Sequence, residues 1–309
     1  MSLEHVVARI AAGRPLVVAA DANASLRARG VALDSPGDLG VLLRSRPKEV
    51  LAHHREEVAC RADLLVALTA DTTPRALAEV GMEHRSAQLT SRAVELALEA
   101  AEDSPKPIAV AGVLGSDQVS PIAANRLHEE LIEHCERLAV AGCELVIARG
   151  QGSRLNLMAA VVAAARTELM TWAVVETRDR EFALDSELFE ALREAGASAV
   201  LFELASVARG LAELARVKDA LEDAGLAPGV LLAASESAMP GFADRSLAPE
   251  TWADHALDLD FAGARVIGGG AGTTEEHLRA LAGALGSLHP SVVARRSDTE
   301  IDPKPPASE

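Results

Sequence analysis

Charged side chains follow several of the short apolar runs in this sequence, and some of them have the chemistry of a binding or catalytic site. The carboxylates of Asp21, Glu203 and Glu236 could act as general acids or bases, or could ligate a hard cation. Arg149 carries a guanidinium group, which binds a carboxylate or phosphate through two hydrogen bonds. Loops are polar in most proteins, so each residue could equally be a solvated or helix-capping side chain. Arg149 could also simply pair with Glu176 or Glu203.

The run Gly268–Gly272, followed by Thr273, is a second candidate for ligand binding. Consecutive glycines let the backbone approach a ligand closely, and the free N–H groups of a helix start can bind an anion. Thr273 and Glu276 have the spacing of a capping box for a helix that begins here. We therefore expect Gly269, Gly270 and Thr273 to contact a ligand, with Gly270 facing it. The alternative is a tight turn before a capped helix, with nothing bound.

Eight short apolar runs alternate with longer segments of helical periodicity, and these elements must position the candidate residues. The predicted strands are Leu16–Ala20, Asp63–Leu68, Ile108–Gly112, Leu145–Ala148, Met170–Val175, Ala199–Leu204, Gly229–Ala233 and Arg265–Gly268. The predicted helices are Pro47–Cys60, Ser86–Glu102, Pro121–Ala141, Leu155–Arg166, Ser186–Ala195, Val207–Ala224, Pro249–Phe261 and Thr274–Leu285.

Apolar strands that are each followed by a helix indicate a parallel sheet covered by helices, because a βαβ crossover places its helix on the sheet. Eight such units predict an α/β fold, a single (β/α)8 TIM barrel. An open doubly wound sheet would need a glycine-rich turn after the first strand, which Ala19–Leu26 lacks. In a barrel, the site is formed where the strands end. This would bring together Asp21, Thr69, Arg149, Glu203 and Glu236.

Composition restricts the class of partner. The 309 residues carry a formal net charge of -16 and only 2% aromatic residues, with no Tyr, which argues against a nucleic-acid or anionic membrane surface as partner. No apolar run approaches the roughly 20 residues of a membrane span, and no signal peptide is evident, so we expect a cytoplasmic protein. A small molecule is the expected ligand. The sequence does not indicate an oligomeric state.

We expect one domain over residues 1–289. The polar, proline-containing tail at residues 290–309 should be disordered, because it cannot bury enough apolar surface to order itself. Cys60, Cys135 and Cys143 form no C-x-x-C pair, so neither a disulfide framework nor a cysteine-rich zinc site is indicated.

Gly268–Leu281, read as G-G-G-A-G-T-T-E-E-H-L-R-A-L, resembles the G-G-C-C-G-T-T-P-E-H-I signature of the homocysteine S-methyltransferase family. Segments elsewhere resemble other motifs of this family in the same order, and the resemblance extends from about Leu16 to Leu288. These segments are Ala19–Gly30, His53–Ala70, Ala109–Ser116 and Leu138–Gly150. The resemblance implies a barrel enzyme that transfers a methyl group to the sulfur of homocysteine.

In that family, zinc held by three cysteines keeps the substrate thiol ionised. The matching positions here are Gly270, Ala271 and Leu204, so all three thiolates are absent. Arg149 stands where the family has an acidic residue that binds the substrate amine, and Leu68 replaces a family asparagine. Asp21 and Thr69 match the family pattern.

The resemblance and its departures imply a divergent homocysteine S-methyltransferase-like protein without zinc–thiolate chemistry. We expect no cofactor and no metal site. We expect it to bind a small anionic or amino-acid-like molecule at the C-terminal mouth of the barrel, with Asp21, Glu203 and Glu236 as candidate catalytic residues. Asp21, Thr69, Arg149, Gly269, Gly270 and Thr273 are the candidate substrate-binding residues. Two alternatives remain open: an active methyltransferase that works without zinc, and a non-catalytic ligand-binding or regulatory barrel. Whether the chain is an enzyme is left undecided by its sequence.

Overall fold

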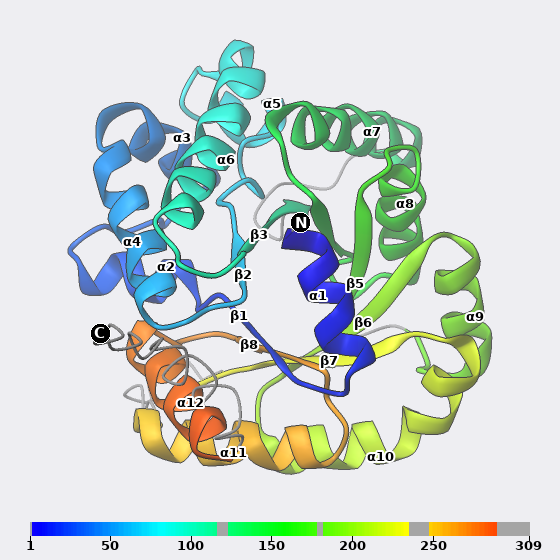
Figure 1. Cartoon of the computed structure of the whole chain (residues 1–309). Coiled ribbons are helices and arrows are strands. Elements are labelled where there is room, and N and C mark those ends of the chain that lie inside the picture. The colour runs from blue at the N-terminus through cyan, green and yellow to red at the C-terminus, as the bar shows by residue number, and fades with distance from the viewer. Residues whose placement is uncertain (1, 116–122, 178–181, 235–246, 289–309) are drawn as a thin grey trace, which may run out of the picture.

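Eight parallel strands close into a barrel in chain order, with β1 paired to both β2 and β8 (Figure 1). The computed structural model describes residues 2–115, 123–177, 182–234 and 247–288. The strands are β1 Leu16–Val18, β2 Leu64–Val66, β3 Ala109–Leu114, β4 Leu145–Arg149, β5 Met170–Glu176, β6 Ala197–Leu204, β7 Ala227–Leu232 and β8 Val266–Gly269. This topology confirms the predicted (β/α)8 TIM barrel.

Eight main helices surround the barrel (Figure 1). They are α4 Pro47–Ala59, α6 Ser86–Glu102, α7 Ala124–Ala141, α8 Arg154–Ala164, α9 Ser186–Glu194, α10 Val207–Ala224, α11 Pro249–Phe261 and α12 Glu275–Leu288. Gly142 and Gly225 end α7 and α10 in the left-handed conformation, with φ of 101° and 67°. Side chains are strained there, which is why the Ala-Gly pairs predicted these helix ends correctly. Among the described residues, no helix is long and apolar enough to cross a membrane.

Several shorter helices were not predicted. They are α1 Ser2–Ala11, α2 Ala22–Ala28, α3 Pro36–Ser45, α5 Pro74–Ala78 and the 3-10 turn η1 Glu83–Arg85. Most are too short to show a clear helical period, so tertiary contacts decide them. Leu26, Leu39 and Leu77 from α2, α3 and α5 form a separate apolar cluster with α4 and α6. The predicted disordered tail, 290–309, lies outside the described residues.

Helix α1 lies over one open end of the barrel (Figure 1). Val6 is fully buried and packs with the side chains that fill the barrel interior, including Leu16 and Trp172. Because α1 leads directly into β1, it covers the end where the strands begin. The opposite end, where the strands finish, is left for a ligand.

A buried carboxylate ties α1 to the strand starts. Asp63 is 1% exposed and immediately precedes β2. Its Oδ2 accepts a hydrogen bond from Val17 N at 3.0 Å. Its Oδ1 pairs with Arg9 Nη1 at 2.8 Å and with Lys106 Nζ at 2.7 Å. This end of the barrel therefore carries a stabilising network rather than a ligand site.

We predict that Asp63→Ala lowers the free energy of unfolding by about 2–3 kcal/mol, because it leaves two half-buried cations and a buried N–H without their partner. Asp103→Ala is the control, since Asp103 pairs with Arg55 in an exposed position. Its loss should be below about 1 kcal/mol. Urea titration of both variants measures the difference, and equal losses would contradict the assigned role of Asp63.

Candidate functional site

A cavity of about 380 Å³ opens where the barrel strands end. Its floor is apolar and its rim is polar. The apolar lining includes Val18, Val66, Val113, Ile147 and Leu231, and the polar lining includes Asp21, Asn23, His53, Thr69, Asp71, Arg149 and Glu203. The expected mouth of the barrel is therefore a real cavity.

Six of the predicted site residues line this cavity: Asp21, Thr69, Arg149, Glu203, Gly269 and Gly270. Thr273 does not line it, although it bonds to residues that do. Glu236 lies outside the described residues. The strand order thus brings most of the candidates together, whereas their roles depend on the contacts described next.

Arg149, at the end of β4, faces two glutamates from the next two strands, Glu176 on β5 and Glu203 on β6. Its Nη2 atom donates to Glu203 Oε2 at 2.5 Å. Glu176 Oε1 lies 3.9 Å from the same nitrogen. Glu176 and Glu203 are register partners on β5 and β6, which explains why both carboxylates reach one guanidinium. The ion pairing that the sequence left open therefore occurs, and a ligand carboxylate would have to share Arg149 with Glu203.

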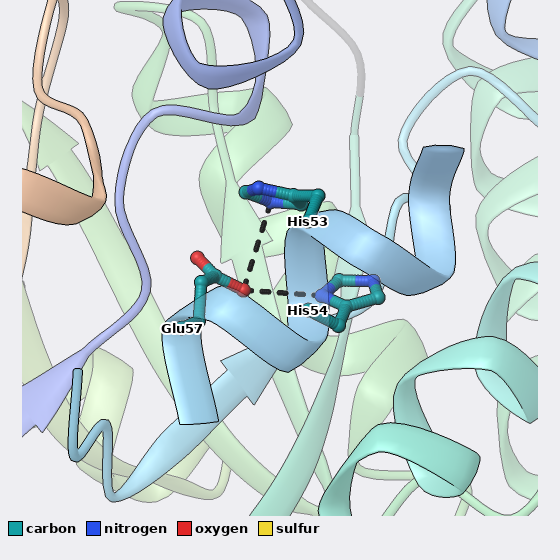
Figure 2. Close-up of side chains that lie close together, drawn as sticks. All are labelled: His53, His54 and Glu57. Carbon is teal, nitrogen blue, oxygen red and sulfur yellow. Dashed lines mark hydrogen bonds and ion pairs between the residues drawn. The ribbon is translucent and has the colours of Figure 1, made fainter. Parts of the chain in front are cut away.

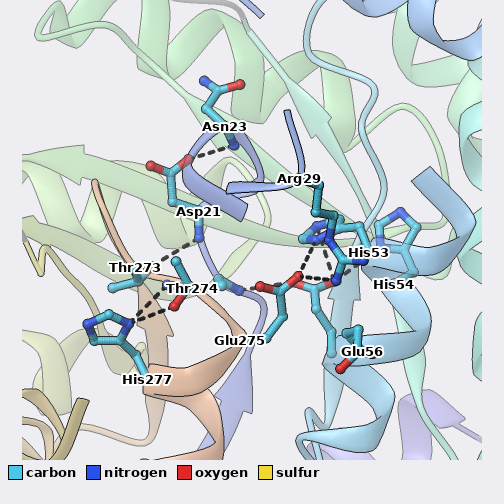
Figure 3. Close-up of polar contacts among 12 residues, drawn as sticks. Asp21, Asn23, Arg29, His53, His54, Glu56, Thr273, Thr274, Glu275 and His277 are labelled. Carbon is cyan, nitrogen blue, oxygen red and sulfur yellow. Dashed lines mark hydrogen bonds and ion pairs between the residues drawn. The ribbon is translucent and has the colours of Figure 1, made fainter. Parts of the chain in front are cut away.

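Asp21 stands at the end of β1 and caps α2. Its Oδ1 atom accepts from Asn23 N at 2.9 Å, and its Oδ2 atom accepts from Gly272 N at 3.0 Å. Its own backbone N–H donates to Thr273 Oγ1 at 3.0 Å (Figure 3). Both carboxylate oxygens thus hold backbone groups, and they join the first and last βα loops. This positioning role competes with any role in acid–base catalysis.

The expected capping box of Thr273 and Glu276 is wrong. Helix α12 begins at Glu275, and the hydroxyl of Thr273 donates to Gly270 O at 2.7 Å within the preceding turn. The imidazole of His277 takes the reciprocal position instead, because its Nδ1 atom accepts from Thr274 N at 3.1 Å (Figure 3). The helix starts one residue later than predicted, since the Thr273 hydroxyl is engaged by the turn and by Asp21.

Gly270 lines the mouth as expected, but there is no room for a side chain at this position. A Cβ atom there would lie 2.8 Å from Ala233 N and 2.9 Å from Leu232 C, both backbone atoms at the end of β7. At Gly269 a Cβ would lie 2.9 Å from Ala20 Cα and would also strike Thr273 Oγ1. These glycines are therefore required by close packing between strand ends, although their backbone still borders the cavity.

Thr69 is fully buried between the ends of β2 and β3. Its Oγ1 atom accepts from Val113 N at 2.8 Å, and its carbonyl oxygen lies 3.1 Å from His134 Nε2. The hydroxyl thus replaces a strand-to-strand hydrogen bond. A ligand would meet Thr69 as part of a rigid wall.

A polar cluster on α4, which sequence reasoning missed, lies beside the cavity. His53, His54 and Glu57 lie close together on this helix (Figure 2). All three are buried, and His53 also lines the cavity. Glu57 Oε2 lies 3.6 Å from His53 Nε2 and 3.1 Å from His54 Nδ1. The i, i+4 spacing of His53 and Glu57 on a predicted helix was the available signal.

The donor atoms of this cluster lie within 4.8 Å of one another, a spacing that a shared metal ion would also require. Both imidazoles already bind carboxylates, because His54 Nδ1 lies 3.1 Å from Glu57 Oε2 and His53 Nδ1 lies 3.1 Å from Glu275 Oε1. Moreover, Glu57 Oε1 accepts from Ala20 N at 3.0 Å. We therefore interpret the cluster as a hydrogen-bonded network that supports the end of β1.

The three cysteines do not supply thiolates to the cavity. Cys60, Cys135 and Cys143 are buried, and none lines the mouth. Burial raises the pKa of the Cys60 thiol to about 11 and that of the Cys143 thiol to about 12. Within the described residues, the cavity lining therefore contains no cysteine.

Comparison with known proteins agrees with this architecture. The profile of the homocysteine S-methyltransferase family matches residues 18–285. The metallated form of the homocysteine methyltransferase MmuM from Escherichia coli superposes with a TM-score of 0.74 at 20% identity, over 87% of this chain and 96% of that chain. Its apo form gives a TM-score of 0.66 at 21% identity, over 88% and 95% of the two chains.

A dihydrodipicolinate synthase from Agrobacterium tumefaciens gives a TM-score of 0.55 at 15% identity, over 93% of this chain and 80% of that chain. At such identities the superpositions show a shared fold alone. The profile match is more specific, because it spans the barrel from β1 to α12. The chain therefore belongs to the homocysteine S-methyltransferase family.

Proposed function

We propose that this chain is a divergent family member that binds a small amino-acid-like molecule in the barrel cavity, without zinc–thiolate chemistry. The positions that match the family's cysteines are Gly270, Ala271 and Leu204, which have no metal-binding side chain. The crowding around Gly270 supports this divergence, because even a Cβ atom there would meet the β7 backbone.

The proposal of an amino-acid-like ligand rests on the charged side chains at the cavity rim. Arg149 offers a cation that can bind a carboxylate, whereas Asp21, Asp71 and Glu203 offer acidic groups that favour an ammonium. Acidic side chains outnumber Arg149 along the lining, so a purely anionic ligand would be repelled. A zwitterion satisfies both kinds of group. The apolar floor suits a short aliphatic or thioether side chain.

Two alternatives follow from family membership. An active methyltransferase without zinc would need another way to ionise the thiol, and neither Asp21 nor Glu203 is well placed to accept its proton. Asp21 already bonds two backbone N–H groups, and Glu203 is paired with Arg149. A binding or regulatory barrel without catalysis requires no such group. Glu236 stays a catalytic candidate on sequence grounds alone.

We predict that the protein binds well under one equivalent of zinc. No thiolate reaches the mouth, and the histidines of α4 are engaged by carboxylates. The measurement is elemental analysis after incubation with excess zinc and exhaustive desalting of the full chain. One retained equivalent that disappears in Glu203→Gln would show a metal centre at the cavity rim and would refute this part of the proposal.

We predict that zwitterionic amino acids such as L-methionine or L-homocysteine bind at least about tenfold more tightly than their decarboxylated amines or deaminated acids. Arg149→Ala should weaken binding of the zwitterion by about tenfold or more, since it removes the guanidinium that binds the carboxylate of the ligand. Arg154→Ala is the matched control, because Arg154 forms an exposed pair with Glu187.

Isothermal titration calorimetry measures these affinities, at a temperature where every variant is folded. If Arg149→Ala bound the zwitterion as tightly as the parent, or if the amine alone bound equally well, the amino-acid assignment would be wrong.

A further inference from the structure

His53 is held between two carboxylates from different parts of the chain. Its side chain is 1% exposed. Nδ1 lies 3.1 Å from Glu275 Oε1 on α12, and Nε2 lies 3.6 Å from Glu57 Oε2 on its own helix (Figures 2 and 3). A neutral imidazole has a proton on only one nitrogen, so two acceptors favour the doubly protonated ring. The geometry therefore selects the cation.

The remaining charged and titratable groups around His53 come from two elements, α4 and α2. His54 on α4 donates to Glu57 Oε2 at 3.1 Å. Arg29, which ends α2, donates to Glu275 Oε1 at 3.1 Å. Two carboxylates thus face one imidazolium and one guanidinium, with a second imidazole at the edge. The two negative charges of the carboxylates are therefore matched by two positive charges only while His53 keeps its proton.

The direction of each pKa agrees with this geometry. Burial lowers the pKa of His53, and the nearby Arg29 guanidinium lowers it further. The attraction of the Glu57 and Glu275 carboxylates is larger than both effects together, so the pKa of His53 is raised from 6.5. Burial dominates for His54, whose pKa is lowered despite its bond to Glu57. Burial raises the pKa of Glu275, yet hydrogen bonds from His53, its own N–H and Arg29 bring it down to about 2.

This network holds two walls of the cavity. Glu57 Oε1 accepts from the N–H of Ala20, which lines the cavity at the end of β1. Glu275 is the first residue of α12 and follows the glycine loop, which lines the cavity beside the end of β1. The bonds of Asp21 to Gly272 and Thr273 join the same two corners, and the bond to Thr273 is drawn in Figure 3.

We propose that protonated His53 is a pH-dependent clamp between the end of β1 and the start of α12, and that the cavity wall loosens when His53 loses its proton. The proposal concerns the cavity to which the proposed function assigns the ligand. Its test needs no ligand, so either proposal can fail without the other.

The sign of the effect follows from the raised pKa. Stability contributed by His53 is fully present below its unfolded pKa of about 6.5 and is lost as pH rises through its higher folded pKa. His54 acts in the opposite direction, because a lowered histidine pKa makes stability fall as pH drops below about 6.5. The two neighbours can therefore be separated on the pH axis.

The experiment is amide hydrogen exchange of peptides covering residues 18–24 and 270–280, at pH 6 and pH 9, corrected for intrinsic rates. In the parent chain, exchange of both peptides should be about tenfold faster at pH 9 than at pH 6. His53→Gln should show the fast exchange at both pH values. His54→Gln is the matched control, since His54 is buried on the same helix and contacts the same Glu57, and it should keep the pH dependence.

Equal protection of the parent at both pH values, or a pH dependence that survives in His53→Gln, would overturn the proposal. If His53→Gln does not fold, imidazole NMR of the parent replaces it. One histidine should then titrate above pH 6.5 together with the change in exchange, and Glu275→Gln should shift that titration to lower pH. The proposal would also be overturned if no histidine titrated over the pH range in which the hydrogen exchange of these peptides changes.

Discussion

Closure of the barrel between β1 and β8 is the interaction on which the site depends. Leu16, Val17 and Val18 pair with Val266, Ile267 and Gly268, and Ala19 O continues the ladder by accepting from Gly269 N at 3.0 Å. Beyond the last backbone hydrogen bond of this strand pair, the contacts involve side chains: the Asp21 carboxylate binds Gly272 N, and Asp21 N binds the Thr273 hydroxyl. Strands β1 and β8, which are more than two hundred residues apart in the sequence, therefore end at the same level of the barrel. The cavity forms around this β1–β8 seam.

The glycines at this seam are a packing requirement first. Leu231 and Val18 crowd Gly268, Ala20 crowds Gly269, and the end of β7 crowds Gly270. Small residues allow the three strand ends to approach, which brings β7, β8 and β1 into contact around the mouth. A side chain at Gly270 would have to displace backbone, so the chemistry of this loop is restricted by the same packing that closes the barrel.

Charge at the mouth is arranged in opposing pairs rather than as isolated reactive groups. Arg149 lies between Glu203 and Glu176, and His53 lies between Glu57 and Glu275. Partly buried ions are stable only when they are paired, because removing a charge from water is costly. A ligand therefore enters a site whose charges already have partners. Affinity then depends on how well the ligand replaces those contacts, which favours a ligand with both a cation and an anion.

The sequence by itself determined the barrel, since each apolar run followed by an amphipathic helix leaves few other parallel arrangements. It also placed Asp21, Arg149 and Glu203 at strand ends, because strand order and direction require that they share one edge. Tertiary structure decided the rest. Thr273 could have capped α12 on spacing alone, but its hydroxyl bonds to Gly270 and Asp21 instead. Nor does local pattern reveal that His53 of α4 meets Glu275 of α12, because residues 222 positions apart become neighbours only when the last helix closes against the early part of the chain.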